Sequence, residues 1–285
     1  MGIADRDYHR HRPQSSGFLA QLSPVVKWLL FANGGIFFVD LFIGHKMLDF
    51  GVFTIQSAIF EYQFWQFVTF QFLHGSLGHL LFNSITLYFF GPWMERWWGS
   101  KKFLIFYLLC GCAGAVFFTL LMFLGILPGG MESGMIGASA GIYGILIGVA
   151  VVAPDLRVAL LFPPIELSMR QLAIALLVIP IGAILLSLGG NEGGEAGHLG
   201  GAILGFILVR YPGLLGMHAG MKIFRSQAAR PPFESKLKPR TRFRMDEDSA
   251  VDLILDKVSR EGFQSLTDDE REILRQASER QNSDS

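Results

Sequence analysis

Four polar side chains lie in otherwise apolar segments, and their types suit nucleophilic catalysis. His79 and Asn83 are four residues apart, so on a helix they share one face. Ser139 lies in the small-residue stretch Gly-Ala-Ser-Ala-Gly, and His198 begins the motif His-x2-Gly-x3-Gly. A serine hydroxyl is a weak nucleophile until a base takes its proton, and a neutral imidazole is such a base. A Ser139–His198 pair would therefore be able to attack a carbonyl carbon.

The same residues offer hydrogen-bond donors for the negative charge that this attack creates on the carbonyl oxygen. The backbone N–H of Ser139 would lie at a helix N-terminus, where N–H groups lack partners within the helix and the dipole favours an anion. His79 and the amide of Asn83 could supply two further donors. We therefore expect an oxyanion site beside the serine.

The glycines near these residues predict how two helices come together. Gly201 and Gly205 follow His198 at helical spacing, so its face is bare of side chains. Small residues at this spacing let helices approach closely in lipid. Tyr143 lies four residues after Ser139 and shares its face. We expect the two helices to pack backbone to backbone and to bring the hydroxyl to the imidazole.

Neither an orienting acid nor a metal site is predicted. Glu192 and Glu195 precede His198 in what reads as a loop, where we expect both to face water. The chemistry would then be that of a Ser–His dyad, not a triad. His74 and His79, five residues apart, do not share a helix face well, so no metal pair is expected and His74 reads as a packing residue. No motif indicates a cofactor.

Composition indicates a membrane protein. The chain has 285 residues, of which 51% are hydrophobic and 17% charged, whereas soluble domains carry about 25% charged residues. The balance of 24 Lys+Arg against 24 Asp+Glu argues against a nucleic-acid partner. A membrane span needs about 20 mostly apolar residues. Six segments are predicted to span: 24–44, 76–94, 103–127, 137–153, 171–188 and 196–210.

The distribution of Lys and Arg predicts the orientation. With six spans, 23 of the 24 basic residues fall on one side and only Lys46 on the other. The positive-inside rule then places both termini in the cytoplasm. In this topology the second, fourth and sixth spans all begin at the extracytoplasmic face. Their polar residues would therefore lie at a similar depth, near that face.

Taken together, these motifs resemble those of the rhomboid family of intramembrane serine proteases. The resemblance covers about residues 20–212. It rests on His74-x4-His79-x3-Asn83, Glu95-Arg-Trp-Trp-Gly99, Gly137-x-Ser139 with Tyr143, and His198-x2-Gly201-x3-Gly205. It implies an all-α bundle of six transmembrane helices that opens to water on the extracytoplasmic side. It also implies transmembrane proteins as substrates, cleaved within or beside their spans, and a bacterial inner membrane as the location.

The resemblance also assigns roles. Ser139 would be the nucleophile and His198 the general base. His79 and Asn83 would line the oxyanion site, and Tyr143 would stack on the imidazole. Two other functions remain as alternatives: a rhomboid-like pseudoprotease that binds membrane proteins without cutting them, and a small transporter or channel. The second is disfavoured, because few charges lie inside the spans.

Two aromatic regions predict contact with the membrane interface. The loop 45–75 is long for a helical bundle and aromatic-rich, so we expect a helical element lying half-immersed in the interface. Trp93, Trp97 and Trp98 stand beside basic residues and are expected to anchor the cytoplasmic interface.

The chain is expected to divide into a cytoplasmic tail (1–23), the membrane domain (24–212), a flexible basic linker (213–247) and a small helical cytoplasmic segment (248–285). Residues 222–244 hold eight Lys/Arg and one acid, and contact with anionic lipid is worth about 1 kcal/mol for each basic residue near the surface. The last segment predicts a helical hairpin. Its first helix has an apolar face and ends at Gly262, and its second is opened by the capping box Thr267-Asp-Asp-Glu270. The apolar face consists of Val251, Ile254, Leu255 and Val258.

Overall fold

The computed structural model describes residues 22–160, 164–187 and 190–216, and in the C-terminal part residues 254, 257–258, 264 and 266–283. The chain divides into two compact units, Met1–Phe233 and Glu234–Ser285. Most of the expected N-terminal tail and the whole basic stretch 222–244 lie outside the described residues.

The first unit is predominantly helical, and each segment predicted to span a membrane contains most or all of one of its main helices. Helices α1 and α5 are long and apolar enough to cross a membrane, whereas α6 and α7 are shorter apolar helices. The all-α class is thus confirmed in its main feature, and the count of six spans stays a prediction. The main helices are α1 (Pro24–Phe42), α4 (Leu77–Trp98), α5 (Ser100–Phe123), α6 (Ser139–Val152), α7 (Met169–Leu185) and α8 (Glu192–Arg210).

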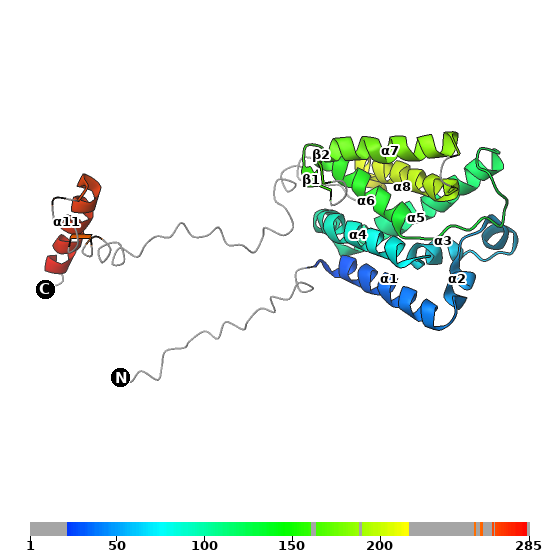
Figure 1. The fold of residues 1–285 in the computed structure, drawn as a ribbon, viewed down its shortest axis with the longest axis horizontal. Helices are drawn as coiled ribbons and strands as arrows, with labels where there is room; N and C mark the ends of the chain where they lie inside the picture. The colour runs from blue at the N-terminus through cyan, green and yellow to red at the C-terminus, as the bar shows by residue number, and fades with distance from the viewer. Residues whose placement is uncertain are drawn as a thin grey trace. The chain divides into compact units, whose positions relative to one another are not determined.

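Helices α5, α6 and α8 form the centre of this unit, each packed against the other two (Figure 1). On one side α4 packs against α6 and α5, and α1 packs against α4. On the other side α7 lies along α8 and α6. A short antiparallel hairpin of β1 (Arg157–Ala159) and β2 (Glu166–Ser168) connects α6 to α7. Helix α6 is therefore surrounded by α4, α5, α7 and α8, whereas α8 keeps an exposed side at Ile203 and Phe206.

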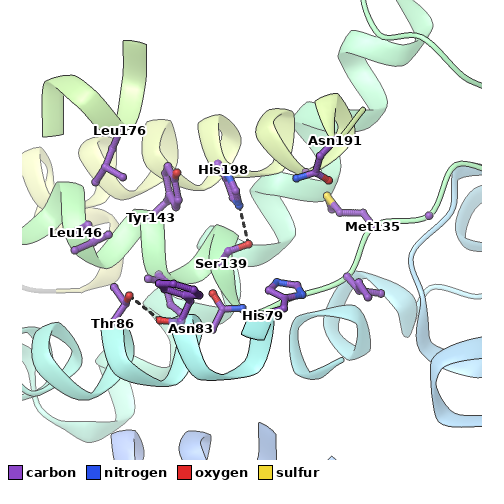
Figure 2. Close-up of a pocket in the computed structure, with 15 residues that line it drawn as sticks. His79, Asn83, Thr86, Met135, Ser139, Tyr143, Leu146, Leu176, Asn191 and His198 are labelled. Atoms are coloured by element: carbon purple, nitrogen blue, oxygen red, sulfur yellow. Dashed lines mark hydrogen bonds between the residues drawn. The ribbon is translucent and has the colours of Figure 1, made fainter. Parts of the chain in front are cut away.

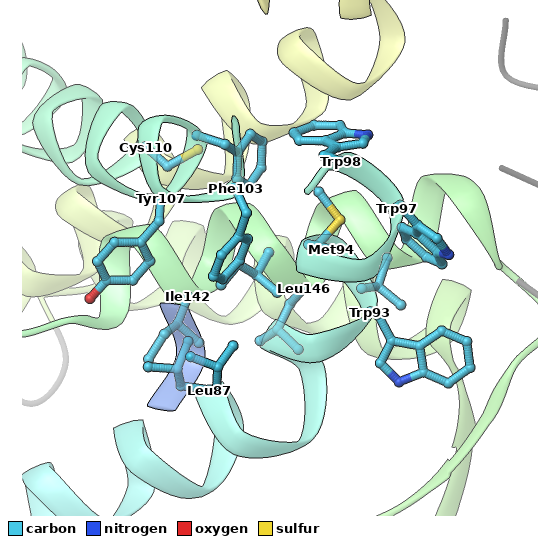
Figure 3. Close-up of a cluster of buried hydrophobic side chains, with 14 of the residues drawn as sticks. Leu87, Trp93, Met94, Trp97, Trp98, Phe103, Tyr107, Cys110, Ile142 and Leu146 are labelled. Atoms are coloured by element: carbon cyan, nitrogen blue, oxygen red, sulfur yellow. The ribbon is translucent and has the colours of Figure 1, made fainter. Parts of the chain in front are cut away.

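The tryptophans at the end of α4 belong to the core. Trp93, Trp97 and Trp98 are each only 7% exposed and join a buried cluster with side chains of α5 and α6 (Figure 3). Trp98 meets the ring of Phe106 edge-on, with 4.8 Å between centroids. The expectation that they anchor the membrane interface is wrong. The packing of α4 against its neighbours covers these rings, and a tryptophan is as suited to a core as to an interface.

Glu95, between these tryptophans, is 3% exposed and joins α4 to the start of α1. Its carboxylate accepts hydrogen bonds from the backbone N–H groups of Val25 and Val26 at 2.9 and 3.0 Å, and from Ser100 Oγ at 2.6 Å. The first N–H groups of a helix have no partner within it, and an anion is favourable there. Glu95 thus acts as the N-terminal cap of α1.

The loop before α4 is helical, as predicted. It contains α2 (Lys46–Gly51), the π-helical turn η3 (Gln56–Phe60), α3 (Gln66–Thr69) and the 3-10 turn η4 (Phe70–Phe72). Its exposed aromatic side chains are Phe50, Phe60, Tyr62, Phe64 and Trp65.

The same loop also holds the segment that leads into α6. Phe53 and Met135 exchange backbone hydrogen bonds of 3.1 and 2.8 Å, and the N–H of Gly137 donates to the carbonyl of Phe70 at 2.9 Å. These bonds fix the chain just ahead of Ser139.

In the second unit, α11 (Asp268–Ser283) is the second helix of the predicted hairpin. Thr267 and Glu270 form the expected capping box, with bonds of 2.8 and 3.3 Å. Lys257 contacts both carboxylate oxygens of Glu270 at 2.9 Å, and this contact lowers the pKa of Glu270 below its usual value. Of the predicted first helix, Ile254, Lys257 and Val258 are described, and all three are helical. Its other named positions, Val251, Leu255 and Gly262, lie outside the described residues.

Candidate active site

Ser139 is the first residue of α6, and a glycine two residues earlier shapes the approach. Gly137 has a φ of +122°, a conformation that residues with a side chain rarely adopt. A Cβ there would also lie 2.7 Å from the Cε1 and Nε2 atoms of His79. A glycine is therefore required at position 137, both because of its backbone conformation and because the ring of His79 leaves no space for a side chain. Its small size lets the serine and His79 lie side by side.

The Oγ atom of Ser139 lies 2.8 Å from the Nε2 atom of His198 (Figure 2). The serine comes from the start of α6 and the histidine from the second turn of α8, 59 residues later in the chain. The imidazole is mostly buried, with its side chain 16% exposed. The structure thus contains the meeting of hydroxyl and imidazole that the spacing predicts.

Two glycines of α8 make this meeting possible. A Cβ on Gly201 would clash with the carbonyl oxygen of Ala140, and a Cβ on Gly205 would lie 2.6 Å from the Cα of Gly144. No side chain fits between the two backbones at either point. The expected backbone-to-backbone packing of α6 and α8 is therefore present.

Tyr143, one turn after Ser139 on α6, covers one face of the imidazole. The two rings lie parallel, with 4.2 Å between centroids and 7° between planes. A stacked ring restricts rotation of the imidazole and excludes water from that face. The stacking implied by the family resemblance is present in the structure.

The expectation about the two acids before His198 is wrong. Helix α8 begins at Glu192, so Glu192 and Glu195 both lie in its first turn and not in a loop. Glu192 is buried, at 7% exposure. Glu195 has a side chain that is 22% exposed, and its Oε2 atom lies 3.1 Å from the Nδ1 atom of His198.

The i,i+3 spacing of Glu195 and His198 is the signal that could have revealed this contact, because it puts both residues on one helix face. Placing the helix start four residues too late concealed it. Acidic residues are favourable in a first helical turn, which supports the earlier start.

His79 and Asn83 of α4 face the same site from the opposite side (Figure 2). The hydroxyl of Ser76 accepts a hydrogen bond from the N–H of His79 at 3.1 Å and so caps the start of α4. Asn83 is 7% exposed, and its Nδ2 atom is buried with no hydrogen-bond partner among the described residues. An unpaired buried amide is costly, so such a donor is suited to an oxygen atom that enters from outside.

His74 lies against His79, with 5.0 Å between ring centroids, and is 4% exposed. It is not among the residues that line the cavity at Ser139. Burial, together with the neighbouring His79, lowers the pKa of His74 to about 4. Its position agrees with the packing role expected for it.

Ser139, His198, His79 and Asn83 line one cavity of about 470 Å³. Its walls come from α4, the segment before α6, α6 itself, α7 and the start of α8. Polar and apolar side chains both line it, as suits a backbone carbonyl flanked by apolar side chains. Several lining residues had no signal in the sequence, because they are ordinary apolar or loop residues. They include Met135, Leu146, Leu176 and Asn191.

The protein is predominantly helical and contains helices long enough to cross a membrane. Its site pairs a serine hydroxyl with an imidazole, in a cavity that also holds an unpaired amide. The model of the rhomboid domain family matches residues 61–213, which is more than half of the chain. The chain therefore belongs to the rhomboid family, which is membrane-embedded and includes proteases that act on membrane proteins within the bilayer. A second match, over residues 243–280, is to a family of unknown function, DUF6576.

Individual relatives agree with this assignment. The chain is 27% identical over 202 residues to the rhomboid protease GluP of Bacillus subtilis, covering 65% of this chain and 36% of that protein. It is 28% identical over 145 residues to the RHOMBOID-like protein 4 of Arabidopsis thaliana, covering 50% and 33%. It is 27% identical over 155 residues to the Rhomboid-like protease 3 of Toxoplasma gondii, covering 54% of each chain. The chain thus spans between a third and about half of the length of these relatives.

Proposed function

We propose that this protein is an intramembrane serine endopeptidase that cleaves transmembrane proteins in or near their spans. The observation that carries the proposal is the 2.8 Å contact between Ser139 Oγ and His198 Nε2. It lies in a cavity that also presents an unpaired amide, that of Asn83. The rhomboid proteases among its relatives support the same reaction class.

In the first half of the reaction, Oγ of Ser139 bonds to the scissile carbonyl carbon while its proton moves to Nε2 of His198. The carbonyl π electrons move to the oxygen, and the resulting anion takes hydrogen bonds from the Ser139 backbone N–H, Asn83 Nδ2 and His79. When the carbon–nitrogen bond breaks, the leaving amine takes the proton from Nε2. An ester between the substrate and Ser139 remains.

In the second half, water replaces the amine. Nε2 of His198 takes a proton from water as the water oxygen bonds to the ester carbon. The same donors stabilise the second oxyanion, and Oγ of Ser139 leaves with the proton from Nε2. Asn191, a polar residue that lines the cavity, can hydrogen-bond to this water as it enters.

We infer a bacterial inner membrane location with both termini in the cytoplasm. The support is the distribution of 23 of 24 basic residues on one side of the six predicted spans. In this orientation the N-terminal ends of α4, α6 and α8, which carry the site, face the extracytoplasmic side. Residues 222–244 would then lie at the cytoplasmic surface and contact anionic lipid.

Labelling by a fluorophosphonate probe tests the proposal without knowledge of the substrate. The wild type should form a covalent adduct and Ser139→Ala should not, because the probe reacts with an activated serine. Cleavage of a model transmembrane substrate should follow the same pattern. A wild type that neither labels nor cleaves would show instead a rhomboid-like protein that binds membrane proteins without cutting them.

A further inference from the structure

The imidazole of His198 has a hydrogen-bond partner on each ring nitrogen. Nε2 lies 2.8 Å from Ser139 Oγ, and Nδ1 lies 3.1 Å from Oε2 of Glu195. Both side chains of the second contact are mostly buried, with 16% exposure for the histidine and 22% for the glutamate. This contact is therefore shielded from most of the solvent that weakens surface ion pairs.

The chemistry of the carboxylate decides where the imidazole proton lies. An ionised carboxylate can only accept hydrogen bonds, so the neutral imidazole must carry its proton on Nδ1 to bond with Glu195. Nε2 then keeps its lone pair and faces the hydroxyl of Ser139. In the other tautomer Nε2 would carry the hydrogen and could not accept the serine proton.

We propose that Glu195 is a positioning residue of this site, so that Ser139, His198 and Glu195 act together as a triad. The proposal rests on the proposed protease function. Glu195 holds the imidazole in the tautomer that can take the serine proton, and its negative charge stabilises the imidazolium that forms when the proton arrives. The transferred proton stays on Nε2 until the leaving group takes it and does not pass on to Glu195.

The other groups around the imidazole do not offer this function. From α6 the neutral ring of Tyr143 stacks on it, and from α4 the second histidine, His79, faces the site. From α5 the residues against this part of α8 carry no charge, such as Ala113, Gly114 and Phe117. In the part of the chain that the structure describes, Glu195 is the acidic side chain in contact with His198.

A purely structural role for Glu195 makes a different prediction. An acid in the first turn of α8 also favours the helix through the dipole. If that were its whole effect, neutralising it would lower thermal stability and leave the turnover of the folded enzyme unchanged. Measuring kcat and KM separately from stability therefore distinguishes the two roles.

The experiment uses the full chain in detergent, with Glu195→Gln, Glu195→Asp and the control Glu132→Gln. Glu132 is an exposed acid in the segment before α6 and does not line the cavity. Glu195→Gln should lower kcat and the rate of fluorophosphonate labelling about 10- to 100-fold, a part of the 10²- to 10⁴-fold that a positioned base contributes. KM should stay unchanged, Glu195→Asp should recover part of the loss, and Glu132→Gln should match the wild type.

The outcomes separate this inference from the proposed function. If the wild type labels and Glu195→Gln has the same kcat as the wild type, the triad is overturned and the proposed protease function stands. The triad is also overturned if the activity lost in Glu195→Gln is explained by the fraction of the variant that is unfolded, as measured by thermal unfolding. A wild type that does not label overturns the proposed function and the triad together.

Discussion

The ring of Tyr143 lies parallel to the imidazole of His198, with 4.2 Å between centroids and 7° between planes. Tyr143 and Ser139 are one turn apart on α6, so a single helix supplies both the proposed nucleophile and the ring that stacks on its proposed base. The imidazole is thus held by a stacked ring, by Glu195 on one nitrogen and by Ser139 on the other. Catalytic groups need placement to within about 1 Å, and three contacts on one ring provide it.

This stack predicts different results for two substitutions at Tyr143. Tyr143→Phe keeps the ring and should retain nearly full turnover. Tyr143→Ala removes it and should lower kcat about 2- to 13-fold, because aromatic pairs are worth about 0.5–1.5 kcal/mol beyond the area they bury. Turnover of a model transmembrane substrate measures both. Equal loss in the two variants would indicate that the hydroxyl, and not the stacked ring, matters.

Removal of either member of the Ser139–His198 pair should abolish cleavage. Ser139→Ala and His198→Ala leave the backbone packing of α6 against α8 unchanged, so both proteins should fold. When two residues act as a unit, substituting either one removes nearly all activity, so the double variant should be no less active than either single variant. Cleavage assays with thermal unfolding in detergent test this. A double variant that is far less active than both single variants would contradict a shared role.

The buried amide of Asn83 should act on the transition state. Loss of one oxyanion donor typically costs about 100- to 1000-fold in kcat, so Asn83→Ala should fall in that range, and His79→Ala should also lower kcat. Thr86 offers a control on the same helix, since it lines the cavity but donates its hydroxyl to the carbonyl of Phe82 at 2.8 Å. Thr86→Val should leave kcat unchanged. Full activity of Asn83→Ala would make the amide a packing group.

A side chain at Gly201 should abolish the proposed activity through geometry. Gly201→Val inserts a branched group where a Cβ would meet the carbonyl oxygen of Ala140. The two helices must separate, which should break the bond between hydroxyl and imidazole and cost about 1–3 kcal/mol of stability. Ile203, on the same helix and 45% exposed, is the control, and Ile203→Val should be silent. Probe labelling and thermal unfolding report both effects, and wild-type labelling of Gly201→Val would refute this packing argument.

Stability should depend on pH through His74. Its pKa in the folded protein is about 4, below the ordinary 6.5, because burial disfavours the charged ring. Between these values the unfolded chain binds more protons than the folded one, so stability falls as the pH drops from 6.5 to 4 and levels off below. The loss from this residue should approach about 3 kcal/mol. The free energy of unfolding, measured with denaturant at several pH values, should change less with pH over this range in His74→Gln than in the wild type. An equal pH dependence in the two proteins would contradict the lowered pKa of His74.

Much of the site follows from local sequence, because helical spacing alone decides which residues share a face. The pairing of His79 with Asn83, and of His198 with two following glycines, is visible without a structure. So are the six apolar segments, since apolarity over a stretch of helical length is a property of the local chain. These features predicted the helices and the meeting of hydroxyl with imidazole.

Other features were decided only by tertiary structure. Trp93, Trp97 and Trp98 lie on a helix that is apolar on nearly every side, so only the packing of its neighbours settles which rings are buried. The contact of Glu195 with His198 depends on where α8 begins, and a glycine-rich start gives that boundary no clear local signal. The unpaired amide of Asn83 likewise becomes meaningful only once the cavity around it is known. Local sequence determines which faces a helix can offer, whereas burial and hydrogen bonding depend on what the rest of the chain places against them.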